Sequence, residues 1–163
     1  MPAAYNINYE TQIACYSGTA LNSLAHSGTL LTGLFCSPID NSTLLLVDSL
    51  FTAGAVVAAT PNPGTQVQWW IQAAIRDTTN SSDEWGSTTY TQAFATGKKN
   101  TEARLAGAMD VYDAGAYYLG PVSIASLFGG VMPRKWRCWV TQNTSLALTS
   151  GQAWYQGIGY NAV

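Results

Sequence analysis

The sequence predicts an all-β protein, an antiparallel β-sandwich or jelly roll with short helical turns. Many short segments alternate apolar and polar residues, which is the period of a strand with one buried face. Turn-forming clusters separate these segments at regular intervals, and the chain contains 15 glycines. Sustained helical periodicity is scarce. We therefore expect one sandwich domain over residues 1–163, with residues 1–8 as a candidate extended N-terminal arm.

Two segments show the strand period most clearly. The strand predicted over residues 66–76 follows a loop, 60–65, whose two prolines and one glycine cannot continue a central strand. Residues 135–141 alternate in the same way. The inward positions are Val67, Trp69, Ile71, Ala73 and Ile75 in the first strand, and Trp136, Cys138 and Val140 in the second. Further strands are predicted over residues 5–14, 29–35, 42–50, 55–60, 88–94, 103–112, 117–124 and 153–160.

Two short segments favour helical turns instead of strands. Residues 19–25 are the first, and residues 122–127 are the second. The second is followed by Gly129 and Gly130, which typically end a helix because glycine adopts the left-handed conformation without strain. Neither segment is long enough to change the predicted fold class.

Charge is sparse, and this excludes two classes of partner. The chain has 7 Lys and Arg against 9 Asp and Glu, a net charge of -2, and only 10% charged residues. An average soluble domain has about 25%. Nucleic acids and anionic membranes are bound through a surplus of basic residues, so neither is an expected partner. A surface with so little charge favours association with neighbouring proteins.

The ends of the chain and its cysteines point to a reducing compartment. The first residues contain neither the basic region nor the apolar core of a secretion signal, so we expect synthesis as a soluble cytoplasmic protein. Cys15, Cys36 and Cys138 are odd in number and far apart in sequence. This spacing argues against a disulfide scaffold or a zinc site, and it is typical of small buried apolar residues.

Residues for catalysis are hard to find, and we predict neither an enzyme nor a cofactor. His26 is the only histidine, and no nucleophile motif accompanies it. The carboxylate pairs Asp83–Glu84 and Asp110 with Asp113 are interpreted as a solvated loop and a strand end. Gly97-Lys98-Lys99 lacks the remaining residues of a phosphate loop and indicates an exposed turn.

The aromatic residues suggest an interface. Trp69 and Trp136 share the apolar faces of their strands, whereas Trp70 and Trp139 point the opposite way and would lie in water unless something covered them. A partner protein is one candidate cover, and a long loop of the same chain is the alternative. The cluster Arg134, Lys135 and Arg137 beside Trp139 has the composition of an interface anchor, although a local electrostatic contact would explain it equally well.

The C-terminal half resembles a known group of proteins. Residues 118–136 read Tyr-Leu-Gly-Pro-Val-Ser-Ile-Ala-Ser-Leu-Phe-Gly-Gly-Val-Met-Pro-Arg-Lys-Trp, residues 140–148 read Val-Thr-Gln-Asn-Thr-Ser-Leu-Ala-Leu, and residues 154–160 read Trp-Tyr-Gln-Gly-Ile-Gly-Tyr. This series resembles that of small virion proteins of tailed bacteriophages. The N-terminal half agrees more loosely, through Leu-Asn-Ser-Leu-Ala at residues 21–25 and Asp-Asn-Ser-Thr at 40–43.

The resemblance implies a structural protein of the virion, and we expect a capsid decoration or cement protein. Such proteins bind between subunits of the major capsid protein, often as trimers, so the expected partners are that protein and further copies of this chain. Two alternatives stay open at this stage. One is a structural protein associated with the tail or fibre, and the other is a carbohydrate-binding sandwich that uses Trp70, Trp85 or Trp139 as a sugar platform.

Overall fold

Ten strands and three short helices make up the part of the chain that the computed structural model describes, residues 5–16, 19–22, 24–75, 85, 93–94 and 98–162. The strands are β1 (Tyr5–Tyr9), β2 (Ile13–Ala14), β3 (Leu34–Phe35), β4 (Ile39–Asp40), β5 (Asp48–Val57), β6 (Thr65–Ala73), β7 (Arg104–Val111), β8 (Gly115–Ser123), β9 (Lys135–Gln142) and β10 (Ser150–Ala162). The helices are α1 (Asn41–Leu44), α3 (Lys99–Glu102) and α4 (Ile124–Leu127).

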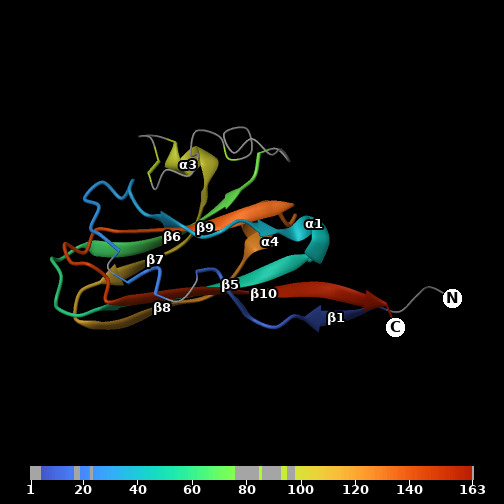
Figure 1. Cartoon of the computed structure of the whole chain (residues 1–163), viewed down its shortest axis with the longest axis horizontal. Helices are drawn as coiled ribbons and strands as arrows, with labels where there is room; N and C mark the ends of the chain where they lie inside the picture. The colour runs from blue at the N-terminus through green and yellow to red at the C-terminus, as the bar shows by residue number, and fades with distance from the viewer. Residues whose placement is uncertain are drawn as a thin grey trace.

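The strands form two antiparallel sheets that lie face to face (Figure 1). The first sheet has the order β1-β10-β5-β8, and β2 also pairs with β10. The second has the order β3-β9-β6-β7, and β4 also pairs with β9. When β1 with β2 and β3 with β4 are each counted as one interrupted strand, these are the two sheet orders of a jelly roll. The predicted fold class is therefore confirmed.

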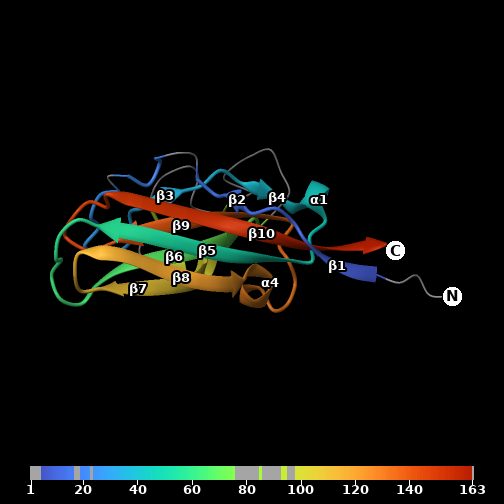
Figure 2. The same cartoon turned by 90° about the horizontal axis from the view of Figure 1, so that it is seen from below.

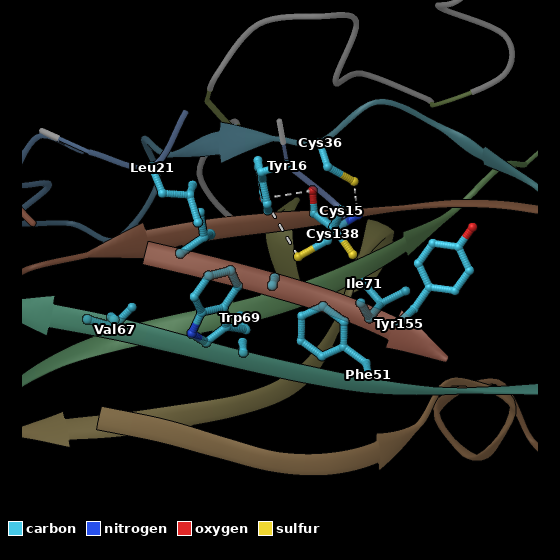
Figure 3. Close-up of a cluster of buried hydrophobic side chains, with 14 of the residues drawn as sticks. Cys15, Tyr16, Leu21, Cys36, Phe51, Val67, Trp69, Ile71, Cys138 and Tyr155 are labelled. Carbon is cyan, nitrogen blue, oxygen red and sulfur yellow. Dashed lines mark hydrogen bonds between the residues drawn. The ribbon is translucent and has the colours of Figure 1, made fainter. Parts of the chain in front are cut away.

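The core lies between the sheets and is rich in aromatic rings. The ring centroids of Phe51 in β5 and Trp69 in β6 are 6.1 Å apart, and those of Trp136 in β9 and Tyr155 in β10 are 5.3 Å apart. Figure 3 shows side chains from both sheets meeting in this layer. The alternation predicted for β9 is confirmed, because all three of its inward positions are buried in this core.

The predicted strand 66–76 is correct in its facing but too long. Val67, Trp69 and Ile71 are fully buried in the core, as expected. The strand ends at Ala73, however, and Ile75 is exposed, so its predicted inward position is wrong. Residue 76 lies outside the described residues.

The two strands predicted over residues 42–50 and 55–60 are in fact a helical turn followed by one long strand. Asp40 accepts a hydrogen bond from the Ser42 amide at 2.8 Å, which caps α1, and Leu45 ends this helix in the left-handed conformation. Strand β5 then runs without a break through Gly54, where the sequence suggested an interruption. The Tyr118 ring lies over Gly54 and takes the place of the missing side chain.

Two other predicted segments are also corrected. Only Leu34 and Phe35 of the expected strand 29–35 form a strand, because Leu30 has a positive φ and the Ser27 hydroxyl accepts hydrogen bonds from the next loop amides. Residues 19–22 form turns instead of a helix, and Leu21 is fully buried in the core while Leu24 packs against it. Of the predicted strand 88–94, only 93–94 are described.

The helical turn predicted over residues 122–127 is confirmed as α4. The Ser123 hydroxyl accepts from the Ser126 amide and caps its start. Gly129 and Gly130 both have positive φ values and follow its end, as the sequence suggested. None of the helices in the described ranges has the length and apolar character needed to cross a lipid bilayer.

The N-terminal arm is tied to the same chain over the residues that are described. Residues 5–8 belong to β1, which pairs in antiparallel register with the end of β10. The N- and C-terminal ends therefore lie together at one end of the molecule (Figure 1). Residues 1–4 of the predicted arm lie outside the described residues.

Gly33 is expected to be a position where no side chain fits. A Cβ atom there would stand 2.8 Å from the Trp139 ring and would collide with the Val140 carbonyl oxygen. Gly33→Ala should lower the free energy of unfolding by about 2–4 kcal/mol, measured by urea denaturation. Gly120→Ala is the matched control, because a Cβ at Gly120 meets nothing within 4 Å, and its change should stay below about 1 kcal/mol. Equal effects of the two substitutions would contradict this account.

Candidate functional site

The residues predicted to form an interface lie on the outer side of the second sheet, but the chain covers most of them itself. Trp70 and Trp139 point away from the main core, as the alternation predicted. Both are nevertheless buried, in a second apolar cluster with Phe94 and Ala103. The Phe94 and Trp139 rings pack edge to face, with centroids 4.8 Å apart. The connection between β6 and β7 supplies this cover, which was the alternative left open by the sequence.

Lys99 in α3 closes one side of this second cluster. Its ammonium group donates to the Leu30 carbonyl oxygen at 3.0 Å and to Gln68 Oε1 at 3.2 Å. The same group lies 4.6 Å from the centroid of the Trp70 ring, a cation–π contact. Partial burial lowers the pKa of Lys99 below its usual value. The lysine that the sequence placed in an exposed turn therefore has a structural role. Figure 1 shows α3 on the outer side of the second sheet.

Arg137 is buried between two aromatic rings. Its guanidinium carbon lies 3.9 Å from the centroid of the Phe35 ring and 4.3 Å from that of Trp85. Its Nε donates to Gln72 Oε1 at 2.8 Å, while Gln72 Nε2 donates to the Trp85 carbonyl oxygen at 3.0 Å. This arrangement satisfies part of the hydrogen-bonding capacity of a cation that is only 1% exposed.

The five predicted interface residues are thus divided by the fold. Trp70, Trp139 and Arg137 are buried by their own chain, whereas Arg134 is exposed and Lys135 is half-buried at the start of β9. In this conformation a partner could touch only the last two of these side chains. The structure does not bring the five together as one surface.

The residues considered for catalysis take part in surface structure. His26 is exposed, and its Nδ1 accepts a hydrogen bond from the Ser145 amide at 3.1 Å. Asp110 accepts from Gln66 at 2.7 Å, and Asp113 accepts from Thr60 at 2.9 Å, both at the surface. The pair Asp83–Glu84 lies outside the described residues. Within the described ranges, no three His, Cys, Asp or Glu side chains are placed to hold a metal ion.

The outer side of the first sheet, which we call the open face, is the strongest candidate surface. Figure 2 looks onto it, and no other labelled element lies in front of β5, β8 and β10. Register pairing and alternation place a set of mostly apolar and aromatic side chains outward. The apolar and aromatic ones are Ile7 and Tyr9 of β1, Leu50 and Val56 of β5, Ala116 and Tyr118 of β8, and Trp154, Ile158 and Tyr160 of β10. The same register also places Asp48, Thr52, Ser123, Ser150, Gln152 and Gln156 on this side.

The open face carries almost no charge. The strands of the first sheet contain one acidic residue, Asp48, and no basic residue. The Asp48 carboxylate is engaged at the start of α4, where it accepts from the Ser123 hydroxyl at 2.6 Å and from the Ala125 amide at 2.9 Å. Aromatic and aliphatic groups therefore dominate what this face offers to a partner.

Several large side chains on the open face are exposed to solvent. Tyr118 is 77% exposed, and Ile7, Tyr9 and Tyr160 are each more than half exposed. Ile7 lies opposite Tyr160 in the register of β1 and β10, and Tyr9 lies opposite Ile158, so apolar groups stand in cross-strand pairs. Contiguous apolar groups in this number are typical of surfaces that bind another molecule.

The apolar surface continues around the end of the sheet at α1. Leu44, Leu45 and Val47 are exposed there, and Leu45 holds a left-handed backbone conformation that disfavours a leucine. A cavity of about 310 Å³ lies beside them, between β2 and β10. Its lining residues are Glu10, Thr11, Ile13, Thr43, Leu44, Leu46, Tyr155 and Gly157.

Sequence reasoning did not identify the open face, although a signal for it was present. The strand predicted over residues 153–160 alternates, and its outward positions include Trp154, Ile158 and Tyr160 without any charge. The predicted interface residues Trp70 and Trp139 belong instead to the outer side of the second sheet. Which of the two outer faces is covered depends on a loop, and strand periodicity does not report where a loop lies.

Comparisons of the chain with protein-family models, with curated proteins and with solved structures found no match. The resemblance to bacteriophage virion proteins therefore stays a prediction from the sequence.

Arg137→Ala is expected to lower the free energy of unfolding by about 2–4 kcal/mol. The substitution removes a buried cation from between two aromatic rings, and the buried Gln72 Oε1 loses the hydrogen bond from Arg137 Nε. Chemical denaturation followed by tryptophan fluorescence measures this change. Arg134→Ala is the matched control, because Arg134 is an exposed arginine of the same segment. It should lower the free energy of unfolding by less than about 1 kcal/mol. A cost for Arg137→Ala as small as that of the control would argue against the structural role of Arg137.

Proposed function

We propose that the protein is a structural protein of a tailed-bacteriophage virion, and specifically a decoration or cement protein that binds between major capsid subunits. The observation that carries the proposal is the open face, a sheet surface that no described residue covers, which is rich in aromatic and aliphatic side chains and whose strands contain one charged residue, Asp48. Exposure of such a surface to water is unfavourable, and its burial against another protein lowers the free energy because few charged groups lose their hydration. No catalytic step is part of the proposed role.

The proposed mechanism is the burial of surface at capsid junctions. Each copy places its open face on a complementary apolar region of the capsid and removes both surfaces from water. Because the strands of this face lack basic residues and have one engaged carboxylate, little charge must lose its hydration when the face is buried. Capsid expansion or subunit loss must then break many such contacts at once, which stabilises the shell.

The fold supports the proposal by analogy only. Jelly-roll sandwiches occur in viral capsid proteins, but they also occur in lectins and cupins, so the architecture does not select one function. The resemblance of residues 118–136, 140–148 and 154–160 to tailed-phage virion proteins favours the capsid among these. A tail or fibre position would use the same surface with fewer copies in each particle.

Carbohydrate binding is less well supported at the residues first considered for it. Trp85 and Trp139 are fully buried and Trp70 nearly so, and none of the three presents a ring face to solvent. A sugar platform would have to use the open face instead, where Trp154 and Tyr118 stand. Glycan-array screening of the intact protein separates this alternative from protein binding.

The open face should be required for capsid binding. Tyr118→Lys puts a cation on a ring position that is 77% exposed, and burying that unpaired charge against an apolar partner should weaken binding about tenfold or more. Binding is measured by co-sedimentation. The purified protein is mixed with expanded capsids from the phage that encodes it, prepared so that they lack this protein. Wild-type protein should bind in a fixed ratio to the major capsid protein.

Tyr112→Lys is the matched control, because Tyr112 is 75% exposed but lies in the turn after β7, outside the open face. It should bind like wild type. Equal losses in both variants, with unchanged circular dichroism, would refute a role of the open face. Wild-type protein that attaches only to tails would refute the capsid position.

A further inference from the structure

The three cysteines, far apart in sequence, meet between the two sheets. Cys15 follows β2, and its amide donates to the Ala153 carbonyl oxygen of the first sheet at 2.8 Å. Cys36 follows β3, and its amide donates to the carbonyl oxygen of Cys138 in β9 of the second sheet at 2.9 Å. All three thiols are free and buried, as the sequence predicted, but their gathering was not predicted. Figure 3 shows the three side chains together in the core.

The three thiols differ in their surroundings. Cys15 and Cys36 line the same cavity, and the Cys138 amide donates to the Cys36 sulfur at 3.0 Å. Cys138 is linked instead to Tyr16, whose hydroxyl lies 3.6 Å from its sulfur. Cys36 thus receives a backbone N–H donor on its sulfur, and a hydrogen bond to the charged form stabilises a thiolate.

The same contacts set the direction in which each thiol titrates. The hydrogen bond from Cys15, the bond from the Cys138 amide and the nearby Arg137 charge lower the pKa of Cys36 against the opposing effect of burial. The hydrogen bond to Cys36 and burial raise the pKa of Cys15, and burial raises that of Cys138. The lowered pKa and the amide donor on its sulfur both favour Cys36 over Cys15 as the attacking thiolate.

A cavity reaches two of the three thiols. Its volume is about 450 Å³, and Cys15 and Cys36 belong to its lining whereas Cys138 does not. The other lining residues are Ala14, Tyr16, Ala20, Leu34, Phe35 and Ser37. Cys15 and Cys36 are 7% and 6% exposed, and Cys138 is not exposed at all. A small reagent can therefore reach this pair from the cavity and not the third thiol.

We propose that Cys15 and Cys36 are a redox modification site, at which a hydroperoxide that enters this cavity oxidises the pair to a disulfide while Cys138 stays a thiol. The Cys36 thiolate attacks the peroxide O–O bond, forms a sulfenic acid and releases hydroxide. The Cys15 thiol then attacks the Cys36 sulfur, an S–S bond forms, and the hydroxyl group leaves. The Cys15 proton joins the hydroxyl group that leaves Cys36 and gives one water. The proton that Cys36 lost on forming its thiolate neutralises the hydroxide released from the peroxide and gives the second. In sum, two thiols and one hydrogen peroxide give one disulfide and two waters.

The disulfide would join the two sheets at their edge. Cys15 is hydrogen-bonded to the first sheet and Cys36 to the second, so the new bond would bridge the sandwich and close the chain segment between them. Closing a loop of about 20 residues restricts the unfolded chain, and in a domain of this size we expect the midpoint of thermal unfolding to rise by about 5–10 °C. The open face is left unchanged, so this inference does not depend on the proposed function.

Peptide mapping of oxidised protein tests the proposal. Folded protein is treated with hydrogen peroxide, unfolded in denaturant with N-ethylmaleimide to block free thiols, and digested with trypsin without reduction. Arg76 is the first basic residue, so Cys15 and Cys36 share peptide 1–76, while Cys138 lies in peptide 138–163. Peptide 1–76 should lose the mass of two hydrogen atoms and take up no maleimide. Peptide 138–163 should carry one maleimide.

Two variants sharpen the test. Cys138→Ser should keep the disulfide in peptide 1–76, and Cys36→Ser should abolish it and leave Cys15 reactive toward maleimide. A cross-link between peptides 1–76 and 138–163 would overturn the proposal, and so would a peptide 1–76 that retains both thiols. Over-oxidation of Cys36 beside a free Cys15 would also overturn it. The peptide map of the wild-type protein shows by itself which thiols form the disulfide. The proposal can therefore be refuted even if a variant fails to fold.

Discussion

The packing of aromatic rings between the two sheets is the interaction on which the rest of the structure depends. Phe51 and Tyr155 of the first sheet meet Trp69 and Trp136 of the second at centroid distances of 6.1 and 5.3 Å. Strand side chains alternate, so the choice of an inward set also determines the outward set. A slip of one residue in β6 would exchange Trp69 with Trp70. The inner layer thus decides the composition of both outer faces.

The two outer faces differ in how far the described residues of the chain cover them. The connection between β6 and β7 folds over the second sheet, where Trp85 and Lys99 complete the burial of Arg137, Trp70 and Trp139. The first sheet has no such cover among the described residues, and its large exposed side chains Ile7, Tyr9, Tyr118 and Tyr160 are aromatic or aliphatic. In a chain with 10% charged residues, the charged side chains of Arg137, Lys99 and Asp48 hold internal structure. This distribution leaves the open face apolar.

The open face and the thiol pair use separate parts of the molecule. The first is an outer surface whose proposed role is to be covered by a neighbour, and the second lies in the inner layer, beside a cavity. Both arise from the jelly-roll topology, which pairs β10 with β1, β2 and β5 and pairs β9 with β3 and β6. The bends between β1 and β2 and between β3 and β4 bring Cys15 and Cys36 to the same edge of the sandwich.

The sequence by itself determined the fold class, the strands β6 and β9 with their inward faces, the turn α4 and the burial of the three cysteines. These features follow from the local alternation of apolar and polar residues and from turn chemistry, which act over a few positions of the chain. It did not reveal the continuity of β5 through Gly54, because the ring that fills that position comes from another strand.

Only the tertiary structure decided which outer face is covered and which cysteines meet. Arg137 and its partner Gln72 are 65 residues apart, and Cys36 lies 102 residues from Cys138. Contacts at such separations depend on the order of the strands in the sheets and on the path of one long connection. Periodicity records whether a side chain faces inward or outward, but it does not identify the neighbour that the side chain will meet.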